Sequence, residues 1–211
     1  MQFRSQYGQD ALIGEVLFKG KRGVFVDVGA RDGLKFSNTA YLEQAKGWTG
    51  IAVEPHPDLF AELKSCRKCQ CIDVAASSGP ADSLQFIKML EEPFGNSGLL
   101  STFRDRRRLE TIKHEIISVP ARPVSGIIKH LPVVHYLDVD VEGHELEVLK
   151  GVDFDATDIR VIGVEALEGS KQAARIDDFM NGKGYQPFAH LISDRFYCRG
   201  FPSERRLTNG L

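Results

Sequence analysis

The sequence predicts an α/β fold: a Rossmann-like three-layer sandwich around a mostly parallel sheet of seven strands, with an antiparallel edge strand. Along the 211 residues, short apolar runs rich in β-branched side chains alternate with amphipathic segments of helical period, which is typical of βαβ units. Acidic residues recur where these runs end, at Asp27, Glu54, Asp73, Asp138 and Glu165. Parallel strands place their carboxyl ends at one edge of a sheet, and unpaired carboxylates are costly to bury, so the pattern predicts a ligand site there.

Each element follows from a local signal: β-branched runs predict strands, and glycine or proline marks where segments end. Sheet strands are expected over 24–28, 49–53, 70–74, 133–139, 159–165, 185–189 and 194–199. Helices are expected over 10–18, 37–46, 57–65, 123–130 and 171–181, with another ending at Lys150. Residues 83–88 and 115–119 are expected as a short strand and an edge strand. Helical period predicts the inward side chains of the first two helices, which are Leu12, Ile13, Val16 and Leu17, then Ala40, Tyr41 and Ala45.

Length and composition bound the class of protein. The chain fits one domain over 1–211, with 1–22 as an N-terminal helical extension, and its 42% hydrophobic and 27% charged residues are typical of a globular protein. No apolar run approaches the ~20 residues of a membrane helix, and the first residues lack a signal core, so we expect a cytoplasmic protein. The formal net charge of −2 argues against a general nucleic-acid-binding protein.

The first βαβ segment carries the clearest binding signal. Residues 27–33 read Asp-x-Gly-x-x-x-Gly, and Glu54 follows Gly33 by 21 residues, the distance at which an acid grips ribose hydroxyls in nucleotide-binding folds. The dinucleotide pattern has glycine where this chain has Asp27, which disfavours a nicotinamide oxidoreductase. A carboxylate there suits a ligand with a positive group, such as the amino group of S-adenosylmethionine. The plain alternative is a βαβ unit that binds nothing.

The turn after strand 133–139 is rich in acids. Asp138 and Asp140 are two apart in an extended chain and therefore point the same way. Asp138, Asp140 or His144 could remove the proton of an alcohol acceptor during methyl transfer. Alternatively, Asp138, Asp140 and Glu142 could bind Mg²⁺. Helix capping and a surface position are the structural alternatives for these residues.

The cysteines, the loop over residues 88–113 and Asp73 each allow two interpretations. Cys66, Cys69 and Cys71, with the distant Cys198, could bind zinc, but buried free thiols are the preferred interpretation. Residues 88–113 form a candidate substrate loop, whose basic cluster of Arg104, Arg106, Arg107 and Arg108 could hold an anionic substrate or simply form a solvated face. Asp73 could bind an adenine amine or cap a loop.

Several motifs together resemble the FkbM-type methyltransferases, which use S-adenosylmethionine. The resemblance lies in residues 25–33, 37–39, 47–55 and 137–151, and residues 5–10, Ser-Gln-Tyr-Gly-Gln-Asp, resemble the opening of one branch of that family. It implies a Rossmann-like sheet and O-methylation, often of sugars or other hydroxylated precursors. It further implies that Asp138 lies beside the reacting centre and that Ser37 and Asn38 approach the cofactor's carboxylate. The residues expected around the cofactor are Asp27, Gly29, Ala30, Gly33, Ser37, Asn38, Glu54, Pro55, Asp73, Val74 and Asp138.

The sequence therefore predicts an S-adenosylmethionine-dependent O-methyltransferase acting on a hydroxyl of a small molecule or sugar. The alternative is a catalytically idle cofactor-binding or scaffold protein of the same fold. Expected partners are the acceptor and, as an open alternative, a second copy in a homodimer, but neither nucleic acid nor a membrane.

Overall fold

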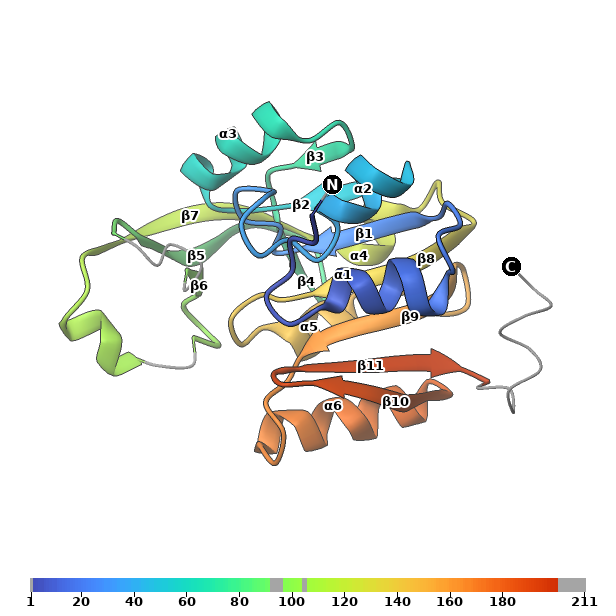
Figure 1. Cartoon of the computed structure of the whole chain (residues 1–211). Helices are drawn as coiled ribbons and strands as arrows, with labels where there is room; N and C mark the ends of the chain where they lie inside the picture. Colours follow the sequence, from blue (N-terminus) through green and yellow to red (C-terminus); the bar gives the residue numbers. More distant parts are fainter. Residues whose placement is uncertain (1, 92–96, 104–105, 201–211) are drawn as a thin grey trace.

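The computed structural model describes residues 2–91, 97–103 and 106–200 (Figure 1). Within these ranges, seven strands form the main sheet in the order β10-β11-β9-β8-β1-β2-β3. The parallel strands are β1 (Val24–Val28), β2 (Thr49–Val53), β3 (Gln70–Ile72), β8 (Val133–Val139) and β9 (Asp158–Glu165). Strand β11 (Asp194–Arg199) runs antiparallel to both β9 and the outermost strand β10 (Tyr185–Leu191). The predicted mostly parallel α/β sheet is confirmed.

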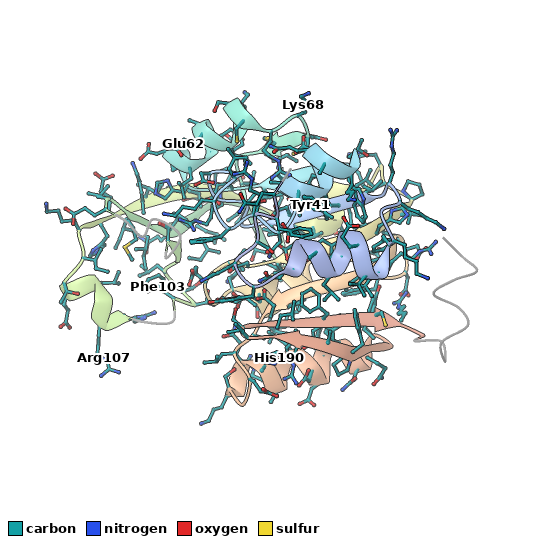
Figure 2. The ribbon with its side chains drawn as sticks, viewed as in Figure 1. Tyr41, Glu62, Lys68, Phe103, Arg107 and His190 are labelled. Carbon is teal, nitrogen blue, oxygen red and sulfur yellow. The ribbon has the colours of Figure 1, made fainter. Side chains whose placement is uncertain are left out.

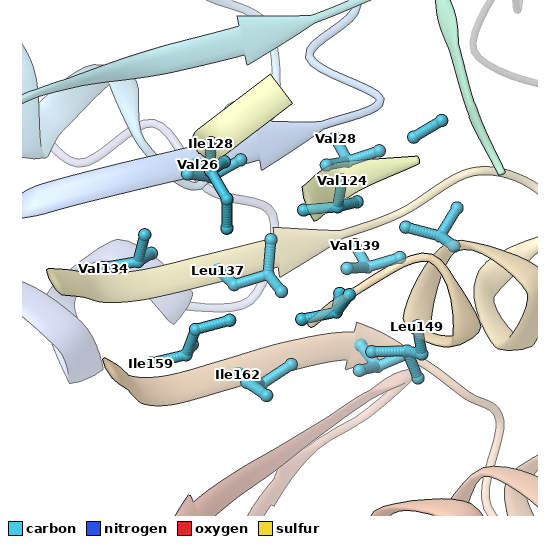
Figure 3. Packing of buried hydrophobic residues seen from close by; sticks show 14 of the residues in the cluster. Val26, Val28, Val124, Ile128, Val134, Leu137, Val139, Leu149, Ile159 and Ile162 are labelled. Carbon is cyan, nitrogen blue, oxygen red and sulfur yellow. The ribbon is translucent and has the colours of Figure 1, made fainter. Parts of the chain in front are cut away.

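Helices cover both faces of this sheet, as a three-layer sandwich requires. One face packs against α4 (Val124–Ile128), α5 (Glu145–Lys150) and α6 (Lys171–Gly182). Figure 3 shows this core, in which Val26, Leu137 and Ile162 of the strands lie among side chains of α4 and α5. The other face carries α1 (Gln9–Ala11), α2 (Ala40–Lys46) and α3 (Pro57–Cys66). No helix in the described ranges is long and apolar enough to cross a membrane.

The first helix differs from the predicted α-helix. From Leu12 to Leu17 it is a π-helix, in which the Phe18 amide donates to the Ile13 carbonyl oxygen at 3.0 Å. A π-helix turns less per residue than an α-helix, so the buried stripe shifts. Ile13 and Leu17 are buried as expected, but Val16 is 63% exposed. The prediction of Val16 as inward was therefore wrong.

Two element boundaries and one side-chain orientation also differ from the prediction. Helix α2 begins at Ala40 and not at Ser37. Ser37 lies before the helix, and its hydroxyl accepts a hydrogen bond at 3.0 Å from the Ala40 amide, which has no partner within the helix. Ala45, expected inward, is exposed. Strand β3 ends at Ile72, which leaves Asp73 exposed and Val74 buried.

A second sheet, inserted between β3 and α4, was not predicted. Its four described strands are β4 (Ala75–Ser77), β5 (Ala81–Met89), β6 (Gly98–Leu99) and β7 (His114–Pro123), in the order β4-β7-β5-β6. Residues 115–119, expected as an edge strand, belong to β7 and pair with β5 alone, because β4 pairs with β7 only at residues 121–123. The candidate loop 88–113 includes the end of β5, β6 and a 3₁₀ helix (Arg106–Glu110). In Figure 1 the β5–β7 pair reaches away from the main sheet.

Candidate active site

Two adjoining cavities lie at the carboxyl ends of the parallel strands. The polar cavity, of about 380 Å³, is lined by the acidic residues Asp27, Asp138, Asp140, Glu142, Glu165 and Asp194. The apolar cavity, of about 40 Å³, is lined by Val53, Leu59, Val74, Ala75, Ala76, Phe86 and Leu99, with Glu54, Pro55 and His144. Both cavities contain Gly29, Arg31, Asp140 and Glu142 in their walls. A ligand with an apolar part and a charged part could therefore span them.

The turn after β1 is shaped by contacts within the protein. Gly29 has φ +95°, and a Cβ there would lie 1.8 Å from the Asp140 carbonyl oxygen. Gly33 has φ +82°, and a Cβ there would lie 2.6 Å from a methyl carbon of Leu63 on α3. Both glycines are thus required by backbone conformation and packing. Gly29 lines both cavities, whereas Gly33 lines neither.

Asp27 lines the polar cavity and is also held inside the protein. The Thr39 hydroxyl donates to Asp27 at 2.5 Å, and Arg67 donates to the Thr39 oxygen at 2.9 Å. Arg67 also forms an ion pair with Glu43. Burial raises the pKa of Asp27, and the guanidinium of Arg67 opposes this effect. Sequence reasoning missed Thr39 and Arg67.

Asp138 and Asn38, predicted separately, lie in direct contact. The Asn38 amide nitrogen donates to both carboxyl oxygens of Asp138, at 3.2 and 3.0 Å, and the Tyr136 hydroxyl donates to one of them at 2.6 Å. Burial and the neighbouring Asp27 raise the pKa of Asp138 well above its usual value. The buried Asn38 Oδ1 has no hydrogen-bond partner among the described residues, so it can accept a hydrogen bond from a ligand in the polar cavity.

Asp140 is the most available acid of the site. Its amide donates to the Val28 carbonyl oxygen at 3.0 Å, but its carboxyl group makes no hydrogen bond within the described ranges. Burial raises the pKa of Asp140 well above its usual value, and Glu165 and Glu142 raise it further. A carboxyl group with a raised pKa can exchange a proton near neutral pH.

Glu54 stands at the end of β2, where an acid was predicted. Its two carboxyl oxygens accept hydrogen bonds from the amides of Arg31, at 2.8 Å, and His56, at 2.7 Å. Burial raises the pKa of Glu54 to about 7. Pro55 and Val74 line the apolar cavity with it, and Ala30 and Ser37 line the polar one.

His144 and Asp73 are not brought into the polar cavity. His144 lines the apolar cavity, where its Nε2 lies 2.9 Å from the Ser77 hydroxyl and its Nδ1 lies 3.0 Å from the Thr102 hydroxyl. Burial lowers the pKa of His144. Asp73 is exposed and lines neither cavity, because β3 ends before it.

A family model described as the methyltransferase FkbM domain matches residues 27–187. The chain belongs to the FkbM methyltransferase family. The crystal structure of an FkbM methyltransferase from Methylobacillus flagellatus KT is similar, with a TM-score of 0.54 at 15% identity over 84% of this chain and 43% of that one. The methyltransferase domain of METTL16 matches with a TM-score of 0.50 at 12% identity, over 92% of this chain and 66% of that one.

These structural likenesses concern the fold alone, and this FkbM domain spans less than half of the Methylobacillus protein. No curated protein matches the chain significantly.

The described part of the FkbM domain contains no group of three or more His, Cys, Asp or Glu side chains placed to hold a metal. This geometry gives no support to Mg²⁺ at Asp138, Asp140 and Glu142, or to zinc at the cysteines. Burial raises the pKa of the Cys66, Cys69 and Cys71 thiols, which favours the neutral form.

The basic cluster of the FkbM domain lies partly outside the described residues, which exclude Arg104 and the side chain of Arg108. Arg106 and Arg107 are exposed and line neither cavity. Figure 2 shows Arg107 at the far end of the second sheet, pointing away from the main sheet. Of the two interpretations of the basic cluster, a solvated face is the one that fits these two arginines.

Proposed function

We propose that this FkbM domain is an S-adenosylmethionine-dependent O-methyltransferase that acts on a hydroxyl of a small molecule or sugar. The observation that carries the proposal is the pair of joined cavities of opposite character at the carboxyl ends of the strands. The apolar cavity suits an adenine ring, with Glu54 beside it for ribose hydroxyls. The polar cavity suits a charged amino-acid group and the acceptor.

The residues present fit that cofactor. Asn38 Oδ1 is a buried acceptor without a partner in the described ranges, and Asp138 beside it offers a carboxylate to an ammonium group. When bound, S-adenosylmethionine supplies an electrophilic methyl group on a positively charged sulfur. A positive charge in the polar cavity lowers the pKa of the surrounding acids, so these ionise. The apolar cavity is narrow and must widen to admit a purine; β6 forms part of its wall.

Asp140 is the best-placed base for the acceptor hydroxyl. Asp140 lines both cavities, and its carboxyl group makes no hydrogen bond within the described ranges. The acceptor proton passes to Asp140 as the acceptor oxygen gains the methyl group. Asp138, held by Asn38 and Tyr136, orients the reactants. His144 holds the end of β4 and the segment after β6 through Ser77 and Thr102.

The charge of the polar cavity indicates which class of acceptor can bind there. Its acidic residues outnumber Arg31 and Lys35, its basic lining residues. Such a wall repels a polyanion and tolerates a neutral hydroxyl compound. This supports a small-molecule or sugar acceptor over nucleic acid.

Calorimetric titration with S-adenosylmethionine, S-adenosylhomocysteine and NADH tests the cofactor. We expect micromolar dissociation constants for the first two ligands and no binding of NADH. A dissociation constant of 1 μM corresponds to a binding free energy of about −8 kcal/mol. Transfer of labelled methyl groups is then assayed on methyl glucoside, methyl rhamnoside, catechol and an RNA oligonucleotide. Competition of NADH with S-adenosylmethionine would favour a nicotinamide oxidoreductase. Methylation of the RNA oligonucleotide would refute the proposed small-molecule acceptor. Cofactor binding without methyl transfer to any acceptor would favour the catalytically idle scaffold protein.

We expect the affinity for S-adenosylhomocysteine to rise with pH and to level off above about pH 7. Glu54 is neutral below its raised pKa, and the ionised form accepts hydrogen bonds from ribose hydroxyls more strongly. Ligand binding therefore favours loss of the Glu54 proton. Titrations between pH 5.5 and 8.5 should show this inflection in the native protein and in the exposed control Glu62→Gln, whose position on α3 is labelled in Figure 2. An inflection that persists in Glu54→Gln would refute the assignment.

A further inference from the structure

The N-terminal segment 5–10 has a place in the structure that the family match does not explain. It precedes the matched residues 27–187, yet Gln6, Tyr7 and Gln9 line the polar cavity. Ser5 pairs with Phe36, another residue of that cavity. The segment is therefore a wall of the site and not a free terminus.

Two buried side chains hold this segment. Asp10, fully buried, accepts hydrogen bonds from the amides of Arg4, at 2.6 Å, and Ser5, at 3.1 Å, and from the Ser5 hydroxyl at 2.6 Å. Gln9, 3% exposed, donates through Nε2 to Asp194 Oδ2 at 2.8 Å and accepts from the Tyr7 amide at 2.8 Å. One buried amide thus joins the segment to β11 and fixes the backbone of Tyr7.

The order of the strands indicates which ligand this wall faces. The apolar cavity and Glu54 lie toward β2, whereas Asp194 lies at the start of β11, opposite Glu165 of β9. In the sheet, β1 and β8 separate these two sides. None of Gln6, Tyr7 and Gln9 lines the apolar cavity. The segment closes the site on the side away from the expected adenine and ribose.

We propose that residues 5–9 form the acceptor-binding wall, with Gln6 and Tyr7 in contact with the acceptor and Gln9 as a positioning residue that acts through Asp194. This inference rests on the proposed methyl transfer. The phenol and amide groups supply hydrogen bonds for a hydroxylated acceptor, and the Gln9–Asp194 bond sets their place relative to Asp140.

The positioning role is tested with Gln9→Glu, which places a carboxylate against Asp194, and with the double variant Gln9→Glu/Asp194→Asn, which restores a donor–acceptor pair. Tryptic cleavage after Arg4, followed by mass spectrometry, reports release of the segment. We expect at least tenfold faster cleavage in Gln9→Glu and a return to within twofold of the native rate in the double variant. Gln186→Glu, the same change at an exposed site on β10, should behave like the native protein. Unchanged cleavage in Gln9→Glu would refute the positioning role.

Ligand measurements test which wall the segment forms. In Tyr7→Ala and Gln9→Glu, the affinity for S-adenosylhomocysteine should stay within threefold of the native value. In both variants, KM for the best acceptor of the methyl-transfer panel should rise at least tenfold. In the double variant Gln9→Glu/Asp194→Asn, this KM should return toward the native value. A tenfold loss of S-adenosylhomocysteine affinity would instead assign the segment to the cofactor site. If the native protein binds no S-adenosylhomocysteine, the proposed function fails, whereas the Arg4 cleavage result stands independently.

Discussion

Replacing Asp140 with asparagine is expected to lower kcat for methyl transfer at least ~100-fold, the usual contribution of a general base. The change removes the proton acceptor but nearly preserves size, and the Asp140 carboxyl group has no hydrogen-bond partner to lose in the described ranges. Affinity for S-adenosylhomocysteine should therefore stay within about threefold. The measurement is kcat with the best panel acceptor at saturating S-adenosylmethionine, together with calorimetric titration.

Asp82→Asn provides the matched control, because Asp82 is an exposed residue of β5 that lines neither cavity. It should retain native kcat. Asp138→Asn should differ from Asp140→Asn by weakening cofactor binding, since Asp138 is held by Asn38 and Tyr136 at the expected amino-acid end. Equal rates in Asp140→Asn and Asp82→Asn would exclude Asp140 as the base.

The main sheet could be predicted because its strands are buried on both faces. Such strands appear in the sequence as mostly apolar runs, for example Val133–Val139, which is interrupted only by His135 and Asp138 and whose predicted bounds are those of β8. The second sheet has no such signal. Strand β5 has its exposed residues in the first half and its buried residues in the second, without regular alternation. Strand β6 has two residues, and the β5–β7 pairing joins Met89 to His114 across a long loop. Local patterns do not specify pairings of this kind.

Acids at the carboxyl ends of parallel strands are expected to mark the ligand-binding edge of the sheet. This rule identified Asp27, Glu54, Asp138 and Glu165. It missed Asp194, because an antiparallel strand begins at the edge where its parallel neighbours end, and Asp194 lies opposite Glu165. It also failed at Asp73, whose strand ends one residue earlier. The direction and exact end of a strand depend on pairing, which a sequence shows only weakly.

The stability of the sheet and the geometry of the site both depend on Gly29. In Gly29→Ala, the new methyl group would lie 1.8 Å from the Asp140 carbonyl oxygen, at a residue with φ +95°. The unfavourable backbone conformation costs about 1–2 kcal/mol, and overpacking adds about 1–3 kcal/mol. We expect a loss of about 3–4 kcal/mol in the free energy of unfolding, which lowers Tm by roughly 10 °C in a domain of this size. Chemical and thermal denaturation measure both quantities.

Gly79→Ala is the matched control, because a Cβ at Gly79 meets no atom within 4 Å. It should change the free energy of unfolding by less than about 1 kcal/mol. Since the atom struck in Gly29→Ala belongs to Asp140, relief of the clash must move the backbone of the proposed base. The folded fraction of Gly29→Ala should therefore lose methyl transfer as well as stability, whereas Gly79→Ala keeps both. Equal denaturation midpoints for the two variants would show that β1 and β8 do not approach each other as closely as the site requires.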